Sequence, residues 1–132
     1  MNAKIVFPEL SYRITGLCFK TQKDLGRFCR ECQYADYLEG LFVKENISYQ
    51  REFVLTKLCS DSPQGNRVDF YIESKILFDC KAKSYITKED YFQMQRYLKA
   101  AKAHLGLIVN FRSYHIKPKR VLNNDFLDKK FE

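Results

Sequence analysis

Apolar residues recur at helical spacing in two segments near the start of the chain. In the first, from Ser11 to Lys23, the pattern predicts a helix that ends near Gly26, with Ser11 as its N-cap. The second stripe ends before Asn46 and consists of Glu31, Tyr34, Ala35, Leu38, Leu41 and Phe42. This stripe predicts a second helix and places Glu31 on its buried-facing side.

Shorter apolar runs and turn-rich segments dominate the rest of the chain. They predict a strand over residues 48–58, an exposed turn over 60–66 and two strands over 67–72 and 76–82. A helix over 88–103, a fully covered strand over 105–111 and a short last strand over 114–117 are predicted to follow. Residues 123–132 are expected to form a tail. Successive strands followed by a helical crossover predict an α+β fold with a mixed sheet flanked by helices, in a single domain over residues 1–132.

Charge, apolar run length and cysteine count limit the partners and cellular location that we expect for this protein. The formal net charge of +7 favours anionic partners, although a charged, soluble surface gives the same excess of Lys and Arg. No apolar run is long enough to cross a membrane, and no signal peptide is recognisable, so a cytoplasmic location without membrane association is expected. Five cysteines, an odd number, then favour reduced thiols.

The hairpin from Arg67 to Ala82 contains the candidate chemistry. With a turn at residues 73–75, opposed residue numbers sum to 148, so Asp69 faces Asp79, and Lys81 shares their face. The opposite, apolar face is predicted to hold Val68, Phe70, Ile72, Ile76, Phe78 and Cys80.

Carboxylates opposed at about 5 Å repel each other unless a positive charge lies between them. The two aspartates and the Cys80 main-chain carbonyl would suit Mg²⁺, with Lys81 beside them to stabilise a developing negative charge. The alternative is a surface cluster in which Asp69 pairs with Lys81 or Arg67 and contributes little stability.

Motifs along most of the chain, from Leu10 to Leu122, resemble the GxxExxY family of the PD-(D/E)xK nuclease superfamily. "FCRECQY" supplies Glu31 and Tyr34, and "LGLIVNF" resembles the family's later strand. The other matching positions are Asp69, the (D/E)xK pair Asp79 and Lys81, and the helical residues Gln93, Tyr97 and Leu98. Two positions depart from the pattern, because Phe28 replaces the motif's glycine and Asp79 replaces the commoner glutamate.

The resemblance implies a restriction-endonuclease-like αβββαβ core and a nuclease dependent on Mg²⁺ or Mn²⁺, with DNA as the expected substrate. It implies that Asp69 and Asp79 hold the metal. Glu31 is implied as a further ligand, directly or through water. Lys81 would assist the nucleophile, and Gln93 would orient water or a phosphate. The alternative function is an inactive nucleic-acid-binding or regulatory module of the same fold, and a homodimer or a larger nuclease assembly stays open.

Basic residues flank the proposed site. Lys83, Lys88, Arg96 and Lys99 are candidates for contacting nucleic-acid phosphates, although an ordinary charged helix face would look the same. The pair Cys29 and Cys32 has the spacing of a zinc or iron-sulfur ligand pair. No second such pair exists and the two histidines lie outside the usual spacing, so a thiolate metal site is not expected.

Overall fold

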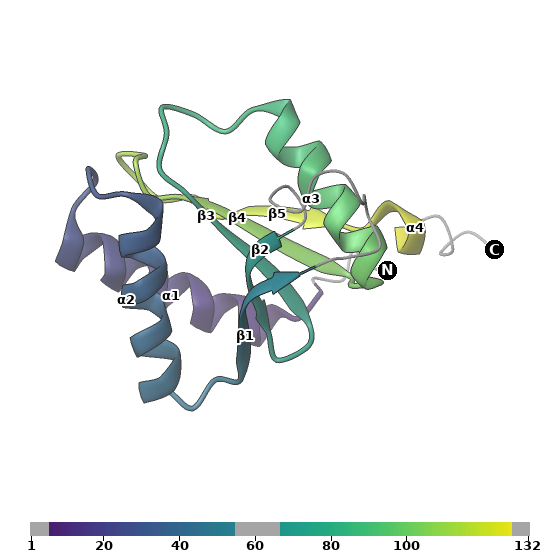
Figure 1. The fold of residues 1–132 in the computed structure, drawn as a ribbon, viewed down its shortest axis with the longest axis horizontal. Coiled ribbons are helices and arrows are strands. Elements are labelled where there is room, and N and C mark those ends of the chain that lie inside the picture. Colours follow the sequence, from purple (N-terminus) through teal and green to yellow (C-terminus); the bar gives the residue numbers. More distant parts are fainter. Residues whose placement is uncertain (1–5, 55–66, 128–132) are drawn as a thin grey trace.

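The computed structural model describes residues 6–54 and 67–127. Helices and strands follow one another in the predicted order up to the last predicted strand, and a short helix follows in the segment expected to be a tail (Figure 1). Their bounds are α1 (Pro8–Leu25), α2 (Glu31–Lys44), β1 (Tyr49–Val54), β2 (Arg67–Ile72), β3 (Ile76–Lys81), α3 (Lys88–Ala101), β4 (Leu105–Asn110), β5 (Lys119–Leu122) and α4 (Asn124–Leu127). The α+β class expected from the sequence is confirmed.

Within residues 6–54 and 67–127, the strands form a five-stranded sheet in the order β1-β2-β3-β4-β5. Strands β3 and β4 are parallel, and α3 makes the crossover between them, whereas the other neighbours are antiparallel. The predicted hairpin register is confirmed over the part nearest the turn, where Ile72 pairs with Ile76 and Phe70 with Phe78.

Helices cover the two faces of this sheet unequally. Figure 1 shows α1 and α2 on one side and α3 on the other. The larger core cluster joins α1 and α2 to the sheet, with Ile14, Tyr34 and Phe42 packed against residues such as Phe70 and Phe78. The smaller cluster lies under α3 and contains Met94, Tyr97 and Leu98. Every residue of β4 is buried, as expected for a central strand covered on both faces.

Gly106 lets β4 approach α3 closely. A Cβ atom at this position would lie 2.5 Å from the Met94 sulfur and 2.7 Å from its Cγ, which is closer than real atoms pack. We expect Gly106→Ala to lower the free energy of unfolding by about 1–3 kcal/mol, because the buried Met94 must move. Gly16→Ala is the matched control, since a Cβ there meets nothing within 4 Å and alanine favours a helix. Urea unfolding of both variants tests this, and equal stability of Gly106→Ala and wild type would contradict it.

Two predicted boundaries were wrong. The first helix begins at Pro8 rather than Ser11, because a proline is already shaped for the first helical position. Ser11 is therefore not an N-cap; its hydroxyl donates to the Pro8 carbonyl at 3.2 Å. The last strand spans Lys119–Leu122, so none of the residues predicted for it, 114–117, lies in the strand; it starts after Pro118, which has no N–H to donate to a ladder.

Other segments differ in smaller ways. Strand β1 spans Tyr49–Val54, and the rest of the predicted strand, with the turn at 60–66, lies outside the described residues. The segment expected to be a tail begins with ordered contacts. The Asn123 amide donates to the Leu98 and Ala103 carbonyls, and Phe126 stacks on His104. Residues 128–132 lie outside the described part of the chain.

Candidate active site

The two aspartates lie where β2 and β3 part. The Cα pairing runs only as far as Phe70 and Phe78, and beyond it side chains take over the cross-strand contacts. The Cys80 N–H donates to Asp69 Oδ2 at 2.7 Å, and the Asp69 N–H donates to Asp79 Oδ1 at 3.3 Å. The predicted juxtaposition of the acids is therefore present, although a backbone ladder does not make it.

This parting also explains a wrong prediction for Val68. The alternation of the hairpin placed Val68 on the same apolar face as Phe70. In the structure, Phe70 packs toward α1 and α2, but Val68 packs in the cluster under α3. Because β2 leaves β3 at Asp69, residues on either side of that point no longer follow one period-two pattern.

A small cavity of about 240 Å³ surrounds the acids. Side chains from α2, β1, β2, β3 and α3 meet there. The lining is mostly polar or charged and comprises Glu31, Glu52, Arg67, Val68, Asp69, Asp79, Lys81, Gln93 and Tyr97. All five of the side chains expected to do chemistry therefore reach one cavity.

Lys81 is the centre of a polar network. Its Nζ lies 3.0 Å from Asp79 Oδ2, 3.5 Å from Gln93 Oε1 and 3.9 Å from Asp90 Oδ1. Burial by itself would lower the pKa of the Lys81 ammonium, but the charges of Asp79, Glu31 and Asp90 outweigh it and raise the pKa. Lys81 is consequently a fixed positive charge at the site.

Asp69 is held in an unfavourable setting for a carboxylate. Burial, together with the neighbouring charge of Asp79, raises its pKa from 3.8 to about 8, even though the Cys80 N–H bond acts in the opposite direction. A carboxyl with this pKa is largely protonated at neutral pH. A positive charge close to Asp69 would favour the ionised form.

Asp90 belongs to this network and was missed in the sequence. It accepts a 2.7 Å bond from Lys83 Nζ, as well as bonds from the Thr87 N–H and hydroxyl, within the capping box of α3. Burial opposes ionisation of Asp90, but these donors and Lys81 hold its pKa below the ordinary value. The signal was available in the Thr87-to-Asp90 spacing, which is that of a capping box.

Glu31 lies at the first residue of α2 and lines the cavity, but its side chain is exposed rather than buried. The other members of the predicted stripe, from Tyr34 to Phe42, are buried as expected. Glu31 differs because it stands at the end of the helix, past the edge of the core.

The acids suit a hard cation with few protein ligands. Within residues 6–54 and 67–127, no three His, Cys, Asp or Glu side chains are grouped closely enough to form a metal site by themselves. Mg²⁺ does not need such a cage, because it is commonly held by one or two carboxylates and completes its octahedron with water and phosphate. The contacting pair Asp69 and Asp79 fits that kind of site.

The predicted phosphate-binding residues separate into two groups. Lys83 pairs with Asp90, and its main chain is fixed by the buried Asn110 side chain, so it helps to shape the site. Lys88, Arg96 and Lys99 lie exposed on α3. Lys99 makes an exposed ion pair with Asp125 at 3.5 Å.

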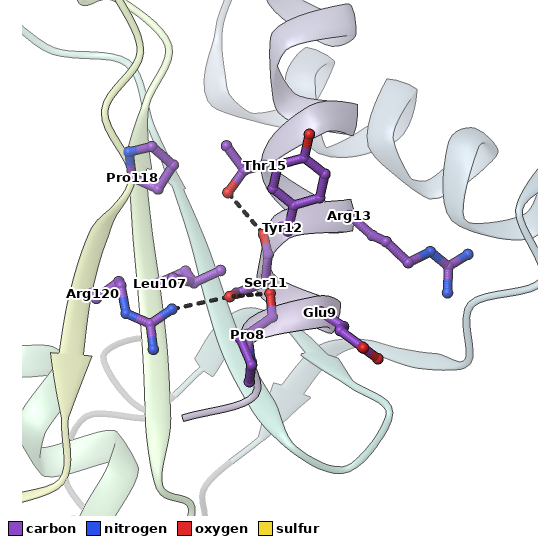
Figure 2. Close-up of a pocket in the computed structure, with 9 residues that line it drawn as sticks. All are labelled: Pro8, Glu9, Ser11, Tyr12, Arg13, Thr15, Leu107, Pro118 and Arg120. Atoms are coloured by element: carbon purple, nitrogen blue, oxygen red, sulfur yellow. Dashed lines mark hydrogen bonds between the residues drawn. The ribbon is translucent and has the colours of Figure 1, made fainter. Parts of the chain in front are cut away.

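A larger hollow lies between α1 and the sheet (Figure 2). Its lining is mainly apolar and includes Tyr12, Leu107 and Pro118. Arg120 crosses it to donate to the Ser11 hydroxyl at 3.0 Å. Its described lining includes one carboxylate, that of Glu9, and no pair of them. The chemistry is concentrated in the smaller, polar cavity.

The cysteines contribute packing on the described part of the chain. Cys18 and Cys80 are buried in the core, as expected for small apolar residues, and burial raises the pKa of both thiols. Cys29 is half-buried and Cys32 is exposed. Cys59 lies outside the described residues.

Comparison with known proteins agrees with this fold. The family model of the PD-(D/E)XK nuclease superfamily matches residues 8–121, and the chain therefore belongs to that superfamily. No curated protein and no solved structure matches the chain. In the described residues, no helix combines the length and apolarity needed to span a bilayer.

Proposed function

We propose that this protein is a metal-dependent nuclease that hydrolyses phosphodiester bonds in DNA in the cytoplasm, within the GxxExxY family of its superfamily. The observation that carries the proposal is the contact between Asp69 and Asp79 with Lys81 at 3.0 Å from the second acid. Membership of a nuclease superfamily supports the reaction class, and the net charge of +7 favours a polyanionic substrate.

Asp69 and Asp79 would hold the metal ion, with the Cys80 main-chain carbonyl and Glu31 as further oxygen donors. When bound, Mg²⁺ or Mn²⁺ supplies a more acidic water and neutralises negative charge on the phosphate. Among the residues that the structure describes, no thiol or imidazole lines this cavity, and the donors there are the hard oxygens that Mg²⁺ and Mn²⁺ prefer.

Lys81 and Gln93 would act on the substrate itself. The Lys81 ammonium is held in the cavity by Asp79 and Gln93. There its positive charge would stabilise the negative charge on the phosphate oxygens in the transition state. The Gln93 amide can donate to a phosphate oxygen or orient the attacking water while its carbonyl accepts from Lys81. Asp90 is a positioning residue, because it acts through Lys81 and Lys83.

The test is a panel of labelled single-stranded DNA, duplex DNA and RNA, incubated with Mg²⁺ or Mn²⁺. We expect DNA to be cut, cutting to stop with EDTA, and Lys81→Ala to slow it about 10²- to 10³-fold, as when one transition-state donor is lost. Lys75→Ala is the matched control, since Lys75 is an exposed lysine in the turn of the same hairpin.

Equal cutting by wild type and Lys81→Ala would identify a contaminant and defeat the proposal. Wild-type protein that binds nucleic acid but cuts no member of the panel would instead favour an inactive binding module of this fold.

A further inference from the structure

Two surface turns far apart in the sequence meet beside the candidate active site. One joins α1 to α2 and contains Arg27 and Phe28, and the other follows β4 and contains Arg112 and Tyr114. Figure 1 shows these two turns side by side at one end of the molecule. We call the surface formed by Arg27, Phe28, Arg112 and Tyr114 the aromatic platform.

Hydrogen bonds fasten the two turns together. The guanidinium Nε of Arg27 donates to the Arg112 carbonyl, and that of Arg112 donates to the Arg27 carbonyl, both at 2.9 Å. The Gln22 amide donates to the Phe111 and Ser113 carbonyls at 2.9 and 2.8 Å. The platform is therefore a fixed surface rather than a pair of loose turns.

Buried aromatic rings support the platform from below. Tyr34 of α2 stacks on Phe111, with ring centroids 4.4 Å apart. The Tyr34 hydroxyl also donates to the Gly26 carbonyl at 2.5 Å and accepts from the Cys29 N–H at 3.2 Å. These contacts hold the α1–α2 turn in place around Phe28.

Large rings on the platform face solvent. Phe28 is 75% exposed and Tyr114 is 73% exposed, so both rings are open to a ligand. The Arg27 guanidinium lies 5.1 Å from the centre of the Phe28 ring and 5.3 Å from that of Tyr114, and Arg112 lies 5.5 Å from Phe28. Exposed rings and guanidinium planes thus alternate on one surface.

The positive charge of the platform has no acidic partner on the described part of the chain. Among the described residues, no carboxylate makes an ion pair with Arg27 or Arg112, although other surface arginines such as Arg51 and Arg67 have acidic partners. A ligand that offers both a flat aromatic surface and a nearby negative charge would complement this surface.

Connectivity places the platform next to the acids. Phe28 precedes Glu31, which lines the cavity, by three residues. On the other turn, the Phe111 N–H donates to the Lys81 carbonyl at 2.9 Å, and Arg112 directly follows Phe111. A chain bound in the cavity can therefore extend onto the platform.

We propose that the aromatic platform binds an unpaired nucleobase of a nucleic-acid strand whose backbone continues into the Asp69–Asp79 cavity. The base stacks on Phe28 or Tyr114, and Arg27 and Arg112 contact its phosphates. Within a duplex, the faces of each base are covered by the neighbouring bases and cannot stack on Phe28 or Tyr114. The substrate class is therefore a single strand, or a duplex with an unpaired end. The proposal rests on the nuclease function above.

The experiment measures binding by fluorescence anisotropy in EDTA, so that no cutting is needed. The probes are a labelled single-stranded DNA, the RNA of the same sequence, a blunt duplex, and a single strand with abasic positions. Phe28→Ala and Tyr114→Ala are compared with Phe19→Ala, a control that removes a ring 51% exposed on α1. Arg27→Lys keeps the charge of the platform but removes a guanidinium plane.

We expect the single strand to bind more tightly than the blunt duplex or the abasic strand. Phe28→Ala and Tyr114→Ala should each weaken single-strand binding by about five- to a hundredfold, the range for one lost base stack, and Phe19→Ala should not. Unchanged binding in both platform variants, or abasic and intact strands that bind equally, would overturn the proposal. A comparison of the DNA and RNA arms identifies which strand supplies the base.

The same experiment distinguishes failure of the platform proposal from failure of the nuclease proposal. If Mn²⁺ is restored and the bound strand stays intact, the cutting function is wrong while loss of binding in the platform variants still supports the platform. If DNA is cut but the platform variants bind and cut as wild type does, the platform is wrong and the nuclease stands.

Discussion

Replacing Asp79 by asparagine should lower Mg²⁺-dependent cleavage by at least about a thousandfold while the protein stays folded. The substitution removes a charge that faces both Asp69 and Lys81 in a largely buried site, where a lost electrostatic contact has a large effect on the transition state. The shape of the side chain is nearly unchanged. Single-turnover cleavage, with circular dichroism to verify the fold, measures the effect.

Two variants make this result specific to the site. Asp79→Glu keeps the charge and lengthens the arm, so it should retain far more activity than Asp79→Asn. Asp125→Asn removes an exposed carboxylate in α4 and should cleave as wild type does. Cleavage by Asp79→Asn at the wild-type rate would show that Asp79 takes no part in the reaction.

Replacing Asp69 by asparagine should make the metal-free protein more stable above pH 4. The pKa of Asp69 rises from 3.8 to about 8 on folding. Between pH 4 and pH 8, the unfolded chain therefore loses the Asp69 proton while the folded protein keeps it. The contribution of Asp69 to the free energy of unfolding therefore falls as the pH rises from about 4 to about 8, and it is constant above about pH 8. At roughly 1.4 kcal/mol for each pH unit, the loss is on the order of 5 kcal/mol.

The measurement is urea unfolding of wild type and Asp69→Asn from pH 4 to 9 in EDTA. The difference in free energy of unfolding should grow with pH and level off above about 8. The asparagine side-chain oxygen can still accept the Cys80 N–H bond, so the comparison isolates the charge. Two parallel pH profiles would contradict the raised pKa.

The core and the hairpin were readable from the sequence because both depend on short periods. The 3.6-residue stripe from Tyr34 to Phe42 and the continuous apolar run of β4 describe surfaces that must be buried. The hairpin register followed from the position of one turn between Ile72 and Ile76.

Other features depend on contacts between distant segments, which periodicity does not encode. The mutual bonds of Arg27 and Arg112 join turns 85 residues apart, so no local pattern announces them. The parting of β2 and β3 at Asp69 is a departure from regular pairing, and it moved Val68 to the other core cluster. Pro8 and Pro118, by contrast, were local signals of where a helix and a strand begin.

The proposed nuclease requires Asp69 and Asp79 to share a divalent cation, and calorimetric titration with Mn²⁺ near pH 7 measures this binding. We predict one binding site per wild-type chain, with release of a proton because Asp69 must ionise on binding. The double variant Asp69→Asn/Asp79→Asn should bind no metal at that site. Absence of binding to wild type at millimolar Mn²⁺, or equal binding by the double variant, would show that the two aspartates do not form a metal site.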